Sequence, residues 1–124
     1  EAVQAGAVAV GVDHDPAAVV AAARNGAHTA VGWLRADAGA LPAADGSVDR
    51  VLLNPPWGRS VAATGRLADR PELLGREVRR VLAPGGTVAL LVPDGTAAPP
   101  DLRLRRRIPV ALAGTRLAVL VLSS

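Results

Sequence analysis

The sequence Asn54-Pro55-Pro56-Trp57 combines residue types that suit the recognition of a planar amine. An exocyclic amine on a base is a poor nucleophile, because its lone pair is delocalised into the ring. The Asn54 side-chain oxygen and the Pro55 carbonyl offer acceptors for its two hydrogens, and the prolines fix the backbone. Trp57 offers a flat face for an extruded base. The motif predicts a catalytic site for transfer to a base amine, with a strand stop beside a core Trp as the simpler alternative.

Two aspartates are candidate ligands for the nucleoside part of a cofactor. Asp13 ends an apolar run, and a carboxylate at such a strand end can accept both hydroxyls of a ribose. A solvated loop acid, or a second cap beside Asp15, is the alternative for Asp13. Asp37 also follows an expected strand and is a candidate acceptor for an adenine amino group, with a turn residue as its close rival. No role is predicted for His14.

Arginines near these positions are candidates for phosphate contact. Arg59 stands two residues after Trp57 and is predicted to bind the substrate. A second basic run covers residues 103–107, where a solvated strand face is favoured over a phosphate site.

Alternating strands and helices are expected to position these residues. Asp15 and Pro16 have the types of a helix N-cap and first helical residue, and Asn25-Gly26 is a helix stop. The continuous apolar runs predict strands buried on both faces. The expected strands cover 7–12, 31–35, 49–53 and 87–92, the expected helices 16–24 and 71–82, and the expected hairpin 104–112 with 116–122. Residues 41–47, 58–70 and 94–101 are expected to be loops, and Pro84-Gly85-Gly86 a turn.

This alternation predicts an α/β fold with a mostly parallel sheet and an antiparallel hairpin at its last edge. Ligands of such sheets bind outside the carboxyl ends of the strands. We therefore expect Asp13, Asp37 and Asn54 to lie at one edge of the sheet, although they are far apart in sequence.

Composition narrows the class of protein. The chain has 124 residues, of which half are apolar, and its 14 basic residues are all Arg. With no Cys, a disulfide framework and a thiolate metal site are excluded, and no metal is expected. The apolar runs are too short to cross a bilayer, and no secretory signal is visible. These features fit a cytoplasmic enzyme, and the net charge of +3 weakly favours a polyanionic partner.

Three stretches resemble class I S-adenosylmethionine-dependent methyltransferases. Ala7–Asn25 resembles their second strand and following helix, and Glu77–Val92, "EVRRVLAPGGTVALLV", resembles the helix, Pro-Gly-Gly turn and fifth strand. The final hairpin resembles their sixth and seventh strands. Arg35–Arg59, "RADAGALPAADGSVDRVLLNPPWGR", is similar to the THUMP-associated RNA methyltransferases, which modify guanine N2 in tRNA or rRNA.

The resemblance implies a Rossmann-like class I methyltransferase sheet, S-adenosyl-L-methionine as cofactor, and tRNA or rRNA as partner. Asp13 matches the ribose ligand, Asp37 the adenine ligand, and Asn54 to Trp57 the amine-holding motif. The family more often has Tyr at the place of Trp57, a change that keeps the stacking face.

One departure concerns the beginning of the sheet. The family's first strand and its Gly-rich loop, which hold the methionine end of the cofactor, have no counterpart, and the THUMP domain is absent. Residues 1–124 are therefore expected to be a partial catalytic domain, truncated at the N-terminus. In the family the missing strand lies between the strands that end at Asp13 and Asn54. The isolated chain is expected to be unstable or to associate through those edges, and to bind the cofactor poorly.

Guanine-N2 methylation of RNA is the favoured interpretation. DNA adenine-N6 or protein glutamine methylation uses the same amine-holding motif and remains an alternative. A non-catalytic remnant, or a binding module that needs a partner to complete its sheet, is a third.

Overall fold

The computed structural model describes residues 2–55 and 63–124. Within them, strands and helices follow one another in the order that the sequence predicts, with one short additional helix, α2. The helices are α1 (Pro16–Asn25), α2 (Arg66–Asp69) and α3 (Leu73–Val81). The strands are β1 (Val10–Asp13), β2 (Gly32–Arg35), β3 (Val48–Leu53), β4 (Leu82–Pro93), β5 (Arg103–Leu112) and β6 (Thr115–Ser123).

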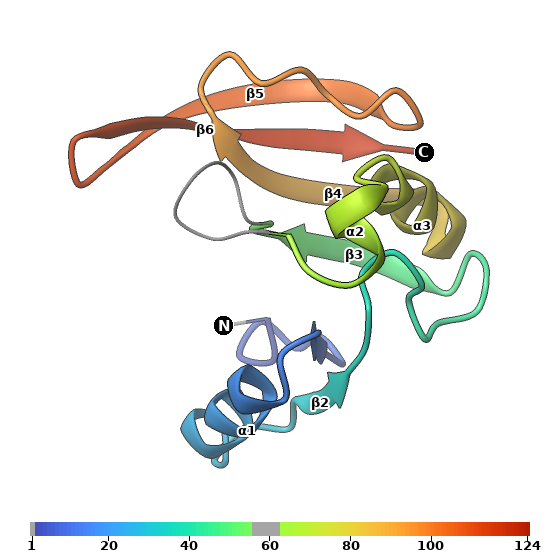
Figure 1. Ribbon diagram of the computed structural model, residues 1–124, viewed down its shortest axis with the longest axis vertical. Helices are drawn as coiled ribbons and strands as arrows, with labels where there is room; N and C mark the ends of the chain where they lie inside the picture. Colours follow the sequence, from blue (N-terminus) through green and yellow to red (C-terminus); the bar gives the residue numbers. More distant parts are fainter. Residues whose placement is uncertain (1, 56–62) are drawn as a thin grey trace.

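The strands form two sheets. β1 and β2 pair in parallel, and a four-stranded sheet has the order β3-β4-β6-β5. β3 and β4 are parallel, whereas β6 runs antiparallel to both β4 and β5. Figure 1 shows the unit of β1, α1 and β2 apart from the larger sheet, joined to it by the chain after β2. The parallel strands and the closing hairpin are confirmed, but β1 and β3 make no pairing with each other in the described residues.

Local chemistry explains where α1 begins. The Asp15 carboxylate accepts a hydrogen bond of 2.8 Å from the Ala17 amide, and Pro16 follows as the first helical residue. The amide of Gly26 closes the helix by donating to the Ala22 carbonyl. The predicted N-cap and stop are both confirmed.

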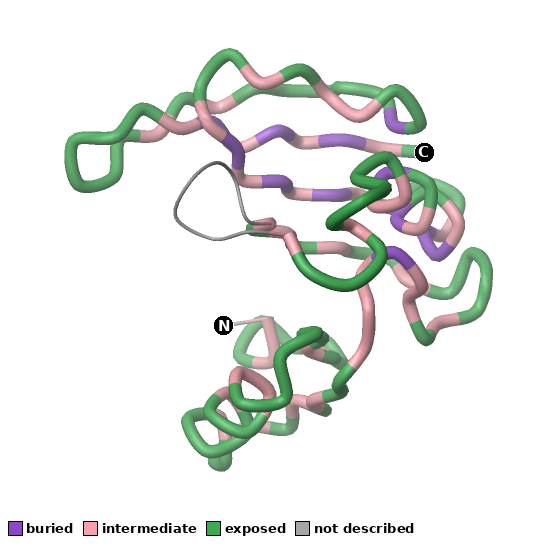
Figure 2. The backbone as a smooth tube through the Cα atoms, in the orientation of Figure 1, coloured by how far each residue is buried: buried purple, intermediate pink, exposed green. Residues whose placement is uncertain are grey.

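The core lies between α3 and one face of the four-stranded sheet. α3 presents apolar residues at helical spacing, and alternate residues of β4 and β6 face them. Figure 2 shows the buried residues gathered there and in the neighbouring segments, with none in the β1–α1–β2 unit. The buried apolar side chains are Val78, Val81, Leu82, Val88, Leu90, Val92, Leu102, Ala118, Leu120 and Leu122.

The prediction that the first and third strands are buried on both faces is wrong. Val8 is 99% exposed and lies outside β1, Val10 is 60% exposed, and Leu52 of β3 is 72% exposed. An apolar run shows that a strand can be buried, but burial on both faces also requires elements packed over each face. In β3, Val51 and Leu53 pack against the core, whereas Leu52 points to the opposite, uncovered face of the sheet.

Two further segments differ from expectation. The predicted loop 58–70 contains the short helix α2. Pro84-Gly85-Gly86 does not separate α3 from the next strand, because β4 starts at Leu82 and passes through these residues. The register against β3 shifts there, from Val48 opposite Leu82 to Arg50 opposite Thr87. The turn is therefore an irregularity within β4.

The hairpin between β5 and β6 is confirmed, with Ala113 and Gly114 at positive φ as a tight two-residue turn requires. Among the described residues, no helix is long and apolar enough to span a membrane.

Candidate active site

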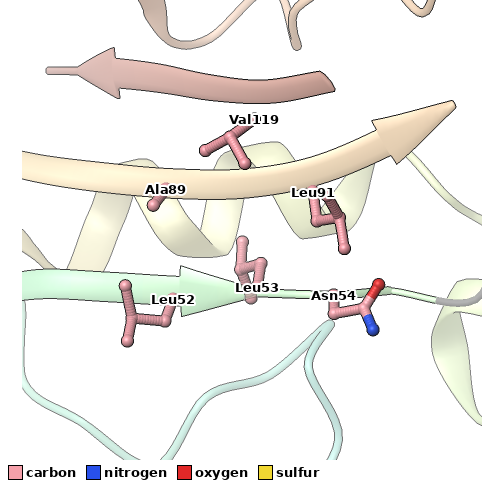
Figure 3. Close-up of a pocket in the computed structure, with 6 residues that line it drawn as sticks. All are labelled: Leu52, Leu53, Asn54, Ala89, Leu91 and Val119. Carbon is pink, nitrogen blue, oxygen red and sulfur yellow. The ribbon is translucent and has the colours of Figure 1, made fainter. Parts of the chain in front are cut away.

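Asn54 and Pro55 follow directly after the last residue of β3. Asn54 is exposed and Pro55 half-buried. Asn54 lines a shallow hollow of about 300 Å³ together with apolar residues of β3, β4 and β6. Figure 3 shows its amide beyond Leu52 and Leu53, near Leu91. The side-chain acceptor that the sequence predicts is therefore accessible at the carboxyl end of a strand. Pro56, Trp57 and Arg59, the other predicted residues of the motif region, lie outside the described residues.

Asp13 is the last residue of β1 and is exposed. Its Oδ1 accepts a hydrogen bond of 2.9 Å from the Asp15 amide, which fixes the turn into α1. Arg35, opposite Asp13 in the parallel pair, donates to the His14 carbonyl at 3.3 Å and stabilises the same turn. Asp13 thus has a structural contact through one oxygen, while its exposure leaves the carboxylate accessible to ribose hydroxyls.

Asp37 lies two residues beyond β2, and both of its carboxylate oxygens have partners. Oδ1 accepts from the Gly39 amide and Oδ2 from the Arg66 amide, each at 2.8 Å. The Arg66 amide, then the Gly39 amide, lowers the pKa of Asp37 below 3.8, with smaller contributions from the charges of His14 and Arg66. The Gly39 contact is the turn role that the sequence offered as an alternative. The Arg66 contact links Asp37 to α2 and is not predicted from the sequence.

His14 is the residue that sequence reasoning missed beside this carboxylate. A Cβ placed on Gly65 would lie 2.3 Å from Asp37 Oδ2 and 3.2 Å from His14 Cε1, so the three residues meet. Their separation in sequence hides this cluster. The only available indication was that His14 and Asp37 each follow the end of a neighbouring parallel strand.

A second cluster, also missed, fixes the loop after Asp37. Arg80 of α3 donates to the carbonyls of Leu41 and Ala43 and to the carboxylates of Glu77 and Asp45, at 2.7–2.9 Å. Glu77 in turn accepts from the Leu41 amide at 2.8 Å. From the sequence, Glu77 and Arg80 form only an ordinary helical pair at i and i+3. In the structure they hold the chain that connects β2 to β3.

The basic run of residues 103–107 forms the exposed edge strand β5. Arg105 donates to the Ser123 hydroxyl at 2.8 Å, and Arg107 donates to the Thr96 carbonyl. Two of its arginines are thus bonded within the fold, which favours the predicted solvated strand face over a phosphate site.

The carboxylates of Asp13 and Asp37 suit the nucleoside part of the predicted cofactor. Asp13 ends β1 and Asp37 lies two residues beyond the parallel neighbour β2, as acceptors for ribose hydroxyls and an adenine amino group would. Asp13 is exposed and Asp37 half-buried, and the backbone amide of Arg66 lowers the pKa of Asp37, which favours its ionised form as an acceptor. Among the described residues, no group of three or more metal-ligating side chains is present.

Comparisons with known proteins agree with the fold described above. TrmN from Thermus thermophilus matches 99% of the chain at 31% identity with a TM-score of 0.72. The match to PH0226 from Pyrococcus horikoshii OT3 covers 97% of this chain and 73% of the PH0226 chain, at 16% identity and a TM-score of 0.71. A Burkholderia thailandensis 1,6-didemethyltoxoflavin-N1-methyltransferase with bound S-adenosylhomocysteine matches 97% of the chain and 62% of its own, at 15% identity and a TM-score of 0.66.

These matches confirm the Rossmann-like methyltransferase fold. The chain spans 39% of the length of the TrmN chain. No curated protein matches the sequence. The sequence profile of the UPF0020 family, described as the RMKL-like methyltransferase domain, matches residues 1–107, and the chain belongs to this family.

Proposed function

We propose that the protein is an RNA methyltransferase that transfers a methyl group from S-adenosyl-L-methionine to an exocyclic base amine, guanine N2 of tRNA or rRNA. The observation that carries the proposal is the exposed Asn54 amide directly after β3, followed by Pro55. The chain that carries this amide belongs to a family of methyltransferase domains.

Asn54 and Pro55 act on the substrate amine. The Asn54 side-chain oxygen accepts one amine hydrogen and the Pro55 carbonyl accepts the other. With both hydrogens held, the nitrogen lone pair is less delocalised into the ring and is directed at the methyl group. Trp57 stacks on the extruded base, and Arg59 contacts a substrate phosphate.

Asp13 and Asp37 hold the cofactor. Asp13 accepts the ribose hydroxyls, and Asp37 accepts the adenine amino group. When bound, S-adenosyl-L-methionine supplies an electrophilic methyl group on a sulfonium. The carboxylates thus fix the nucleoside so that this group meets the amine that Asn54 holds.

Separate observations favour RNA over DNA and over protein. The stretch Arg35–Arg59 resembles RNA methyltransferases, and the net charge of +3 favours a nucleic acid over a protein substrate. DNA adenine-N6 or protein glutamine methylation is the alternative that shares the motif.

A non-catalytic role as a binding module is the second candidate. It is favoured by the split sheet, in which β1 and β3 are not paired with each other. A partner that supplies a strand there would complete the sheet, and the module would contribute no chemistry of its own.

Methyl transfer from labelled S-adenosyl-L-methionine tests the proposal. The protein is assayed as given and in a sheet-completed form, extended before Glu1 by a strand and Gly-rich loop such as those of the Thermus relative. Substrates are tRNA, rRNA, DNA and protein. We expect label in RNA, recovered as N2-methylguanosine, with the sheet-completed form only. Label in DNA or protein contradicts the RNA assignment, and no label with any substrate favours the binding module.

A further inference from the structure

The Asp37 carboxylate connects two parts of the fold. Its Oδ1 contacts the Gly39 amide in its own loop, whereas its Oδ2 contacts the amide of Arg66, the first residue of α2. α2 precedes α3, the helix that packs on the four-stranded sheet, whereas Asp37 follows β2 of the smaller sheet. One side chain therefore links the β1–α1–β2 unit to the segment that follows the Asn54 motif in sequence.

Gly65 is the residue that permits this contact. Its backbone has φ 61° and ψ −144°, a conformation open almost only to glycine. A Cβ on Gly65 would also lie 2.3 Å from Asp37 Oδ2, well inside van der Waals contact, and 3.2 Å from His14 Cε1. Any other residue would force the carboxylate away from the Arg66 amide or away from His14.

The amides leave acceptor capacity on Asp37. A carboxylate oxygen has two lone pairs, and each oxygen of Asp37 uses one for an amide. The remaining lone pairs have directions that these two amides set. Asp37 is half-buried, so part of the residue remains accessible to a ligand.

We propose that Gly65 and the Arg66 amide are positioning residues for Asp37, which orient its carboxylate toward an amino group of the cofactor and make the placement of α2 depend on the same carboxylate. The inference rests on the proposed function in naming the adenine amine as the occupant.

Gly65→Ala tests the proposal in the chain as given, with Gly95→Ala as the matched control. Gly95 also has a positive φ of 87°, but a Cβ there would meet nothing within 4 Å. Two quantities are measured: hydrogen exchange at the Arg66 amide, and the pKa of Asp37 by carbon NMR of its carboxyl group. Neither measurement requires cofactor or substrate. A negative result in them can therefore be distinguished from a failure of the proposed methyl transfer.

We expect Gly65→Ala to speed exchange at Arg66 by about tenfold or more, as loss of a hydrogen bond to a charged group does. The pKa of Asp37 should rise toward its ordinary value, since the Arg66 amide lowers it most. Gly95→Ala should change neither quantity. Unchanged exchange and pKa in Gly65→Ala, or equal changes in Gly95→Ala, overturn the proposal.

A second variant keeps the test decisive if Gly65→Ala does not fold. Asp37→Asn replaces one acceptor oxygen with an NH₂ group, so the Gly39 or the Arg66 amide must lose its partner. We expect exchange at one of these amides to speed by about tenfold. Full protection of both amides in Asp37→Asn contradicts the proposed role of the carboxylate.

Discussion

The Arg80 guanidinium lies 2.8 Å from the Glu77 carboxylate. Both residues belong to α3, but together they bind the loop that follows Asp37. Arg80 donates to the Leu41 carbonyl while Glu77 accepts from the Leu41 amide, so both backbone groups of one residue are satisfied. This loop follows Asp37 and leads into β3, which ends at Asn54. The pair thereby helps to set where two candidate site residues lie.

Glu77→Gln should destabilise the fold by about 1–3 kcal/mol, because it weakens charged hydrogen bonds in a half-buried cluster. Urea unfolding measures the change. Glu72→Gln is the matched control, since Glu72 pairs with Arg70 in an exposed position and should matter little. A Glu77→Gln protein as stable as the parent would show that the cluster does not fix the loop.

Acid should weaken the same fold. Arg80 first, then the Leu41 amide, lowers the pKa of Glu77 below 4.5, and the Arg66 amide lowers that of Asp37 below 3.8. A carboxyl whose pKa is lowered by folding binds protons more readily when unfolded. Its contribution to stability is therefore present above the unfolded pKa and is lost as pH falls through the folded one.

Unfolding free energies measured from about pH 7 down to about pH 3 should decline below about pH 5, and less steeply in Glu77→Gln. A flat profile, or one identical in the variant, contradicts the assignment of these shifts.

Asp13→Ala should weaken cofactor binding by about 1.5–3 kcal/mol, the range for a hydrogen bond to a charged group. Calorimetry on the sheet-completed form measures it, because the chain as given is expected to bind the cofactor poorly. Asp15→Ala is the comparison: it removes the cap of α1 and should lower stability more than affinity. Unchanged affinity in Asp13→Ala would move the ribose role to another residue.

In the described part of the chain, β1 pairs with β2 alone and β3 with β4 alone, and the edge that each strand leaves open should make the chain associate. Exposed strand edges present unpaired amides and carbonyls to other chains, and the apolar exposure of Val10 and Leu52 adds to this. Sedimentation should show association that increases with concentration and decreases in Val10→Lys. Val20→Lys, at an exposed position on α1, should change it little. A monomer at every concentration contradicts this prediction.

Features with local causes could be predicted from the sequence. Asp15 with Pro16 specifies a helix start, and Ala113-Gly114 specifies a tight hairpin, because the residues that decide each structure are adjacent. The strand ends at Asp13 and before Asn54 were likewise predicted from the residues that terminate the apolar runs.

Features that depend on residues far apart in the sequence could not be predicted from it. The contact of Asp37 with Arg66, and the hold of Arg80 on Leu41, join residues that only the folded chain brings together. The exposure of Val10 and Leu52 has a related reason: an apolar run does not reveal whether another element packs over each face of the strand.

Single-turnover methyl transfer by Asn54→Ala in the sheet-completed form tests the central claim most directly. The assay is run with saturating cofactor and the RNA that the parent methylates, and cofactor affinity is measured alongside. Loss of the side-chain acceptor should slow transfer by at least about a hundredfold, as loss of other positioned polar groups does, while cofactor affinity changes little. Transfer at a near-normal rate in Asn54→Ala would contradict the assignment of Asn54 as the residue that holds the amine.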